Sequence, residues 1–208
     1  MTEAIFLKPP PHGTVSNWLG PGMARRLLDF AQARRDSFSP SVVDYKEATE
    51  VDLSVRRSVK VRDLGGLKQE LRARIRAVLP AMFEELGADA FEPRKFEVEM
   101  VAHGDGAFFT EHRDTFLENE KVGEKFVGHR AISAVYYFHR LPKSFSGGVL
   151  RIYSLAGREK STAFVDIEPT NDTLVFFPSW FPHEVLPVVC PSRQFEDSRF
   201  AINCWVRR

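Results

Sequence analysis

Residues 108–114 read FFTEHRD, and this stretch is the key segment for predicting the fold and the site. Its start, FFT, is typical of a β-strand, because aromatic and β-branched residues are favoured in strands. Side chains two residues apart on a strand point to the same face, so His112 and Asp114 project together. An imidazole nitrogen and a carboxylate oxygen on one face can bind neighbouring positions of one metal ion. The stretch therefore predicts two metal ligands at the end of a strand.

A third ligand must come from elsewhere in the chain, and His183, in residues 177–185 (FPSWFPHEV), is the candidate. Two histidines and one carboxylate on one face of an octahedron leave three positions open, which is the facial triad of Fe(II) oxygenases. A 2-oxo acid can chelate through two of these positions and dioxygen can take the third. On its own, His-x-Asp is a weak signal that also occurs by chance at strand ends. Its position among the other strands strengthens the prediction.

From residue 96 onwards the chain shows eight strand-like runs, most of them separated by turn residues such as GDG at 104–106 and GG at 147–148. The runs cover residues 96–102, 107–114, 131–138, 148–153, 162–167, 173–177, 183–188 and 199–206. Eight strands with few helices between them predict a double-sheet jelly roll of the cupin type. His112 and Asp114 then lie in the second strand, and His183 lies in the seventh. Residues 174–177 (LVFF) are apolar at successive positions, which indicates that helices cover the outer face of their sheet.

Helical signals dominate the first part of the chain. Pro21 suits the first turn of one helix. A second helix has an apolar stripe over residues 67–86. We expect Asp63 to cap this second helix, Pro80 to kink or split it, and Gly87 to end it.

A change of pattern near residue 95 gives the domain organisation. The length of 208 residues suits one domain, and a hydrophobic fraction of 43% is enough for a real core. Residues 55–61 are a candidate edge strand. We therefore predict an N-terminal helical support region, residues 1–95, and a β-core, residues 96–208, within one integrated domain. The expected fold class is mainly β with N-terminal helices.

Arg199 opens the last strand and is the candidate for binding the far carboxylate of a 2-oxo acid. Arginine suits this role because its planar fork binds a carboxylate through two parallel hydrogen bonds. On the two-residue period of a strand, one face of this segment consists of Arg199, Ala201, Asn203 and Trp205. That row suits a polar-ended pocket better than an ordinary core. Without the upstream motif, a salt-bridged arginine at a strand end would be the simpler interpretation.

Charge and composition argue against several classes of protein. Lys and Arg number 29 and Asp and Glu 28, so the net charge of +1 gives no electrostatic case for nucleic acid or a membrane surface. No run approaches the length that spans a bilayer, and residues 1–11 lack the pattern of a signal peptide. The two cysteines, Cys190 and Cys204, do not form a C-x-x-C pair. A reducing cytoplasm is the simplest compartment.

Several segments match a known family in the right order. The matching pieces are residues 112–114, 135–138, 147–153, 166–169, 176–177, 182–185 and 199–202. With them, residues 96–206 resemble the Fe(II)/2-oxoglutarate-dependent dioxygenases of the prolyl hydroxylase type, and most of all the hypoxia-sensing prolyl hydroxylases and their bacterial relatives. Singly most of these pieces are common, but together they are specific to the family.

The resemblance implies a double-stranded β-helix core that binds Fe(II), 2-oxoglutarate and O2, with ascorbate as a further candidate cofactor. The expected reaction couples oxidative decarboxylation of 2-oxoglutarate, to succinate and CO2, with hydroxylation of a substrate C–H bond. Tyr137 matches a family tyrosine that helps to bind 2-oxoglutarate, and Leu150 matches a wall of that pocket. Asn203 joins this group through the face that it shares with Arg199. From spacing alone, Tyr137 and Leu150 are ordinary core residues.

Three positions depart from the family pattern. His103 stands near a family tyrosine and is either a substitute hydrogen-bond donor or a loop histidine, and we favour the loop. Phe109 replaces another common tyrosine, so a phenolic hydroxyl is lost. The gap from His183 to Arg199 is longer than usual, and Arg193 lies nearer the common spacing. We nevertheless predict that Arg199 binds 2-oxoglutarate, because Arg193 falls in a polar loop.

The leading substrate hypothesis is a prolyl residue in a peptide or protein, and it rests on family analogy. The first alternative is the same chemistry on a free amino acid or small metabolite. The second is a cupin-like metal-binding sensor module without turnover. Residues 115–130 form a long charged connection, which is either a solvated loop or a lid over the substrate.

Overall fold

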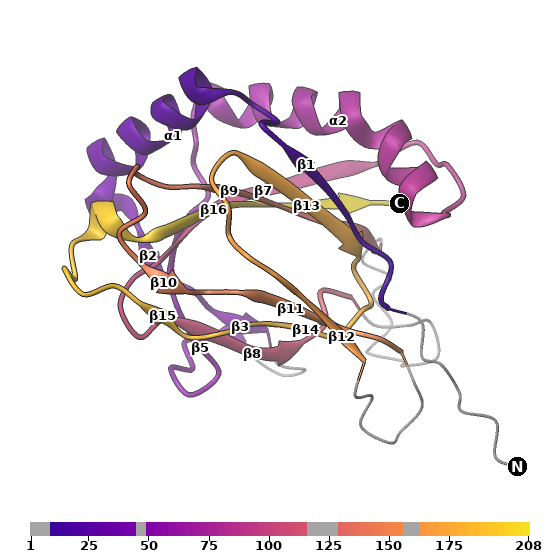
Figure 1. Cartoon of the computed structure of the whole chain (residues 1–208). Helices are drawn as coiled ribbons and strands as arrows, with labels where there is room; N and C mark the ends of the chain where they lie inside the picture. Colours follow the sequence, from indigo (N-terminus) through magenta and orange to yellow (C-terminus); the bar gives the residue numbers. More distant parts are fainter. Residues whose placement is uncertain (1–8, 45–48, 116–128, 156–162) are drawn as a thin grey trace, which may run out of the picture.

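The computed structural model describes residues 9–44, 49–115, 129–155 and 163–208, and its main elements are two antiparallel sheets and two helices (Figure 1). The seven-stranded major sheet has the order β1 (Gly13–Ser16), β13 (Thr173–Pro178), β9 (Arg130–Phe138), β16 (Arg199–Arg207), β7 (Lys95–His103), β6 (Val59–Val61) and β2 (Ser39–Pro40). The five-stranded minor sheet has the order β12 (Phe164–Ile167), β11 (Leu150–Tyr153), β14 (His183–Val185), β8 (Phe108–His112) and β5 (Arg56–Arg57). Two short pairs complete the strands: β10 (Ser146–Gly147) with β15 (Val188–Val189), and β3 (Val43–Asp44) with β4 (Thr49–Glu50). This arrangement confirms the predicted fold class.

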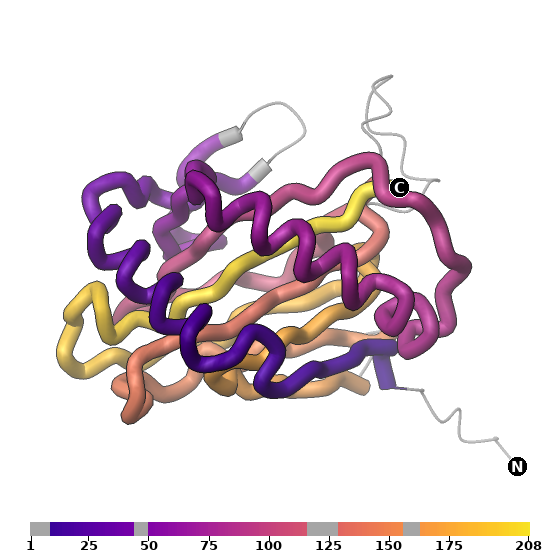
Figure 2. The backbone as a smooth tube through the Cα atoms, turned by 90° about the horizontal axis from the view of Figure 1, so that it is seen from above, coloured from indigo at the N-terminus to yellow at the C-terminus, as the bar shows by residue number. Residues whose placement is uncertain are grey.

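The helices α1 (Pro21–Ala33) and α2 (Gly66–Leu86) lie across the outer face of the major sheet (Figures 1 and 2). Two single turns of 3-10 helix, Arg35–Ser37 and Phe195–Asp197, accompany them. No helix in the described part of the chain is long and apolar enough to cross a membrane.

One of the three expectations about α2, the capping residue, needs correction. The helix continues through Pro80 as one element, so the proline does not split it, and Leu79 and Met82 on either side of the proline are buried in the core beneath the helices. Gly65, rather than Asp63, is the capping residue, and the Asp63 carboxylate instead accepts a hydrogen bond from the Gly65 amide at 3.1 Å. Gly87 ends the helix in the left-handed conformation, with φ of 60°, as predicted.

The major sheet has a core on each of its faces, which explains strands that are apolar at every position. In β13, Leu174 and Phe176 pack in the core beneath the helices. Their neighbours Val175 and Phe177 point the other way, into the core between the two sheets. The helices therefore cover the outer face, as the sequence predicted, and the inner face is free to build a site between the sheets.

The N-terminal region also contributes strands to both sheets, which its helical pattern did not predict. β1 pairs with β13 at one edge of the major sheet. The candidate edge strand at residues 55–61 is two short strands, β5 in the minor sheet beside β8 and β6 in the major sheet beside β7. This segment therefore crosses from one sheet to the other and brings charged side chains to the space between them.

Candidate metal centre

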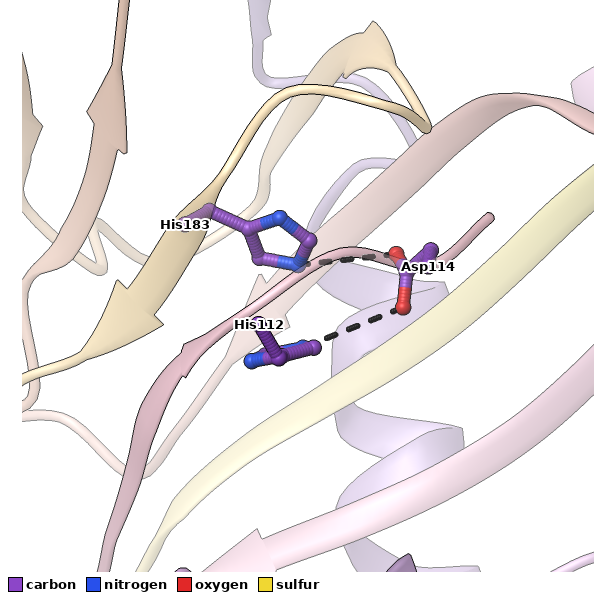
Figure 3. Close-up of side chains that lie close together, drawn as sticks. All are labelled: His112, Asp114 and His183. Carbon is purple, nitrogen blue, oxygen red and sulfur yellow. Dashed lines mark ion pairs between the residues drawn. The ribbon is translucent and has the colours of Figure 1, made fainter. Parts of the chain in front are cut away.

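The three predicted metal ligands lie together between the sheets (Figure 3). β8 and β14 are neighbouring antiparallel strands, in which His112 pairs directly with His183. His112 Nε2 lies 3.8 Å from Asp114 Oδ1, and His183 Nε2 lies 3.5 Å from Asp114 Oδ2. One ligand atom from each residue lies within 4.8 Å of the others. Side chains far apart in the sequence thus converge as the sequence predicted.

Both histidine rings are held with one nitrogen facing the centre. His112 Nδ1 lies 2.9 Å from the Thr110 carbonyl oxygen, and His183 Nδ1 lies 2.9 Å from the Phe181 carbonyl oxygen. A carbonyl only accepts hydrogen bonds, so each Nδ1 carries the hydrogen and each Nε2 presents a lone pair. Burial, helped by the neighbouring His183, lowers the pKa of His112 to about 3, which keeps the ring in the neutral form that binds metals.

The Asp114 carboxylate is held by Ser133, which in turn contacts Ser179, and the sequence did not predict either serine. Burial alone would raise the pKa of Asp114, but His183, His112 and Arg130 outweigh it and lower that pKa. Ser133 Oγ donates to Asp114 Oδ2 at 2.6 Å and lies 2.9 Å from Ser179 Oγ. The only sequence signal was a polar residue on the inward face of the apolar strand β9. Supporting hydrogen bonds of this kind orient metal ligands.

The donor set fits a divalent transition metal such as Fe(II). It consists of two neutral imidazole nitrogens and one ionised carboxylate, which leave part of the coordination sphere to other ligands. The three residues line a cavity of about 380 Å³. Its walls also include the four residues predicted to bind the co-substrate: Tyr137, Leu150, Arg199 and Asn203.

Arg199 is a buried cation inside this cavity. Its exposed fraction is 2%, and its Nε has no hydrogen-bond partner among the described residues. Arg193, the alternative, has a side chain that is 81% exposed and pairs with Asp105 outside the cavity. A buried guanidinium without a carboxylate beside it is unfavourable unless a ligand supplies one. The surroundings of Arg199 thus fit an anionic ligand such as 2-oxoglutarate.

The prediction that His103 is a loop residue is wrong. It is the last residue of β7, only 3% exposed, and pairs with Arg199 in the sheet. Arg199 Nη1 donates to His103 Nδ1 at 3.3 Å, so the ring hydrogen sits on Nε2. Burial, with a contribution from Arg199, lowers the pKa of His103 well below its usual value and keeps the ring neutral. The GDG turn begins at residue 104, directly after His103, so the sequence predicted that this strand ends at residue 102.

Tyr137 and Gly148 complete the surroundings of Arg199. The guanidinium carbon lies 4.8 Å from the centre of the Tyr137 ring. Burial raises the pKa of Tyr137, so its hydroxyl remains a donor, and this oxygen has no hydrogen-bond partner within the described ranges. Gly148 has φ of +68°, and a Cβ there would lie 2.5 Å from Arg199 Cδ. The missing side chain is therefore what lets Arg199 pack where it does, a role that the sequence did not reveal.

The remaining predicted positions either line the cavity or lie outside the described residues. Leu150 is 2% exposed in the core between the sheets. Asn203 is half-buried on β16, opposite Glu99 of β7. Of the charged connection over residues 115–130, residues 116–128 lie outside the described residues, and with them the prediction of a lid.

The chain is similar to known proteins in sequence. Residues 98–207, just over half of the chain, match the family described as the 2OG-Fe(II) oxygenase superfamily. A protein of Synechocystis described as an uncharacterized PKHD-type hydroxylase is 34% identical over 211 residues. That match includes all of this chain, which spans 66% of the length of the relative. Egl nine homolog 1 of Rattus norvegicus is 36% identical in an alignment of 81 residues, which covers 36% of this chain and 20% of the relative.

The fold is also shared with solved structures. A Pseudomonas putida prolyl-4-hydroxylase superposes with a TM-score of 0.66 at 22% identity, over 96% of this chain and 93% of the other. A Trichoplax adhaerens prolyl hydroxylase, solved with a peptide fragment of the hypoxia inducible factor oxygen degradation domain, has a TM-score of 0.68 at 20% identity. That superposition covers 95% of this chain and 83% of the other. At these identities the likeness concerns the fold.

Proposed function

The chain belongs to the 2OG-Fe(II) oxygenase superfamily, and from that premise we propose that it hydroxylates a prolyl residue of a peptide or protein. The observation that carries the proposal is the convergence of His112, Asp114 and His183 in a cavity that also contains the buried Arg199. When bound, Fe(II) and 2-oxoglutarate supply the oxidising chemistry, in which O2 is consumed, succinate and CO2 are released and a C–H bond gains one oxygen atom.

The chain's own residues would bind and orient these groups. His112, Asp114 and His183 would hold the metal, while Ser133 keeps the carboxylate of Asp114 in place. Both Nδ1–H···O=C hydrogen bonds fix the ring orientations before the metal arrives, so little freedom is lost on binding. A set of only three protein ligands would leave coordination positions of the metal open for a chelating co-substrate.

Arg199 would bind the distal carboxylate of 2-oxoglutarate, with Tyr137 as a second donor. Both groups are buried, and each has a polar atom without a hydrogen-bond partner in the described part of the chain. His103 would act as a positioning residue, because it accepts a hydrogen bond from Arg199 and holds the guanidinium in the cavity. Leu150 and Asn203 would form walls of the same pocket.

The prolyl substrate is supported by the relatives. Two of the solved structures with the same fold are described as prolyl hydroxylases, and one of them was solved with a peptide fragment. The compartment proposed from the sequence, a reducing cytoplasm, is consistent with Cys190 and Cys204, which are both free and buried.

A free amino acid or small metabolite is the second candidate substrate. The cavity of about 380 Å³ lies within the range of small-molecule sites, which is roughly 300–1,000 Å³. A sensor module without turnover would use the same ligands but would consume no 2-oxoglutarate.

One assay distinguishes the prolyl hydroxylase, the metabolite hydroxylase and the sensor module. The purified protein is incubated with Fe(II), 2-oxoglutarate and O2, and succinate is measured with prolyl peptides and, separately, with free amino acids. We expect peptide-dependent succinate formation and a peptide product that has gained one oxygen atom. Stimulation by a free amino acid alone would favour the metabolite hydroxylase. Stable Fe(II) binding without any succinate would contradict an enzymatic role.

A further inference from the structure

A second charged group lies in the same cavity, apart from the metal ligands. Glu99 is 2% exposed, and three cations surround it. Arg62 Nε lies 3.2 Å from Glu99 Oε2, Lys60 Nζ lies 3.6 Å from the same oxygen, and Arg56 Nη2 lies 3.9 Å from Oε1. We call these four residues the Glu99 cluster. All four line the cavity.

Lys60 lines the cavity with no acceptor of the described residues within hydrogen-bond distance, while Glu99 Oε1 is the buried atom of the Glu99 cluster that lacks a partner there. The Lys60 side chain is 9% exposed, and its ion pair with Glu99 is longer than a normal hydrogen bond. An ammonium group has three hydrogens to donate, so burial without acceptors is unfavourable. Burial lowers the pKa of Lys60, and Glu99 opposes that effect only in part. An anion beside Lys60 would supply what the protein does not.

The cluster also has more positive than negative charge. Even if Arg56 is left aside, Lys60 and Arg62 bring two positive charges to the single carboxylate of Glu99, although solvent screens the charge of Arg62, whose side chain is 68% exposed. The surplus is one charge, which equals the charge of one carboxylate, whereas a phosphate monoester carries nearly two at neutral pH. A singly charged anion such as a carboxylate therefore matches the Glu99 cluster better than a phosphate monoester does.

The other charged residues that line the cavity in the described part of the chain do not absorb this surplus. Arg130 is paired with Glu97 at 2.7 Å. Arg113 and Glu111 carry opposite charges. A divalent metal and Arg199 together carry three positive charges, and Asp114 and doubly charged 2-oxoglutarate carry three negative ones. The co-substrate assembly is thus neutral, and the positive charge of the Glu99 cluster remains for a different molecule.

The Glu99 cluster is close enough to the metal centre to bind a part of the substrate. The Arg56 guanidinium lies 4.5 Å from the centre of the Phe109 ring, and that ring stacks on His112 with 3.5 Å between centres. A single aromatic ring therefore separates the cluster from a metal ligand. A carboxylate bound by Lys60 would belong to a molecule that also reaches the metal centre.

We propose that the Glu99 cluster is the subsite that binds a carboxylate of the substrate, with Lys60 and Arg62 as its donors, so that the hydroxylated molecule is anionic near the reacting carbon. The inference rests on the proposed function, because it gives the rest of the cavity to the metal and 2-oxoglutarate. The carboxylate belongs either to an acidic residue next to the proline of a peptide or to a free amino acid.

The test measures binding to the protein loaded with Fe(II) and 2-oxoglutarate in the absence of oxygen. The probes are acetylated and amidated tripeptides with a central proline and a flanking Asp, each compared with its Asn counterpart, and L-proline compared with L-prolinamide. Calorimetry should show that an acidic probe binds at least about tenfold more tightly than its amide, the effect of one charge-assisted hydrogen bond. Preference for the Asp peptides identifies a peptide substrate, and preference for L-proline over L-prolinamide identifies a free amino acid.

Two substitutions should change this preference in opposite directions. Lys60→Gln should remove most of it, whereas Glu99→Gln should increase it, because the competing carboxylate is gone. Lys95→Gln is the matched control, since Lys95 is an exposed lysine of the same sheet that does not line the cavity. A role in folding alone would not make the acidic probe bind more tightly to Glu99→Gln.

The outcomes separate this inference from the proposed function. The visible charge-transfer band of Fe(II) with 2-oxoglutarate reports whether each variant is folded and loaded. If the band forms but no acidic probe outbinds its amide, the inference is overturned and the proposed function stands. The inference is equally overturned if Lys60→Gln keeps the wild-type preference. If Lys60→Gln does not load, Glu99→Gln decides alone: no gain in affinity for the acidic probe overturns the proposal. If the wild type itself gives no band, the proposed function has failed and the inference falls with it.

Discussion

Arg199 and the Glu99 cluster lie at two points along the strand pair β16 and β7, yet their surroundings differ. Arg199 of β16 pairs with His103 of β7, and four residues along the same strands Asn203 pairs with Glu99. At about 3.3 Å per residue the two points are roughly 13 Å apart. Among the described residues, the polar side chains beside Arg199 are a neutral histidine and a tyrosine, whereas Lys60 and Arg62 share a carboxylate.

The difference indicates two kinds of ligand. A buried cation with no carboxylate beside it attracts an anion strongly, which suits a co-substrate needed in every turnover. Cations that already share Glu99 attract a further anion less strongly, which suits a substrate whose product must leave. We therefore propose that one cavity has a strong anion site at Arg199 and a weaker anion site at the Glu99 cluster.

Loss of the metal should have the largest effect. Asp114→Ala removes the only carboxylate of the predicted triad, so we expect turnover to be abolished and Fe(II) binding to be strongly weakened. His112→Ala and His183→Ala should behave alike. Metal titration of each purified variant is the measurement, and wild-type affinity in any of them would remove that residue from the ligand set.

Arg199→Ala should have the second largest effect, which is on the binding of 2-oxoglutarate. A hydrogen bond to a charged group contributes about 1.5–3 kcal/mol, or roughly ten- to a hundredfold in affinity. The apparent constant for 2-oxoglutarate in a succinate assay should rise by that factor. Arg193→Ala, at an exposed position, should change it little. The reverse result would mean that sequence spacing, rather than burial, identifies the co-substrate arginine.

Ser133→Ala should weaken metal binding by about tenfold, at the low end of what loss of a supporting hydrogen bond does. The Ser133 hydroxyl orients Asp114 at 2.6 Å. Its loss should leave the 2-oxoglutarate affinity of metal-saturated protein unchanged. Ser144→Ala is the control, because Ser144 is a half-buried serine that does not line the cavity and whose hydroxyl donates to the Pro142 carbonyl. Equal metal affinities in both variants would refute the supporting role.

Gly148→Ala should give the smallest effect on the site. The added Cβ would lie 2.5 Å from Arg199 Cδ, so the arginine must shift. We expect weaker 2-oxoglutarate binding, by less than in Arg199→Ala, and a loss of about 1–3 kcal/mol in the free energy of unfolding. Gly22→Ala, where nothing lies within 4 Å, is the control. Wild-type 2-oxoglutarate affinity in Gly148→Ala would show that the packing on Arg199 is unimportant.

Local patterns in the sequence were enough for the core strands and the metal ligands. The eight predicted runs correspond to strands because each has alternation or an apolar run bounded by turn residues. His112 and Asp114 were found because the His-x-Asp spacing is a local property, although β8 ends at His112 and Asp114 lies two residues beyond it, rather than within the strand as predicted. β1 to β4 were missed, because strands of two to four residues leave no periodicity to read.

The missed site residues depend on contacts between distant segments. Ser133 supports Asp114 only because β9 passes beside the end of β8. Glu99 and Lys60 meet because β6 pairs with β7, and Gly148 matters only through Arg199. No spacing along the chain encodes these contacts, so the sequence alone did not predict the Glu99 cluster.

The central claim is that Arg199 and the Glu99 cluster serve different ligands in one metal-containing cavity. The most direct test is anaerobic titration of 2-oxoglutarate into Fe(II)-loaded protein, followed by the visible charge-transfer band that bidentate chelation of the metal produces. We predict a saturable band in the wild type, a ten- to hundredfold higher midpoint in Arg199→Ala, and a wild-type midpoint in Lys60→Gln. A Lys60→Gln midpoint that shifts as far as that of Arg199→Ala would contradict the division of the cavity. The absence of any band in protein shown to hold Fe(II) would contradict the account as a whole.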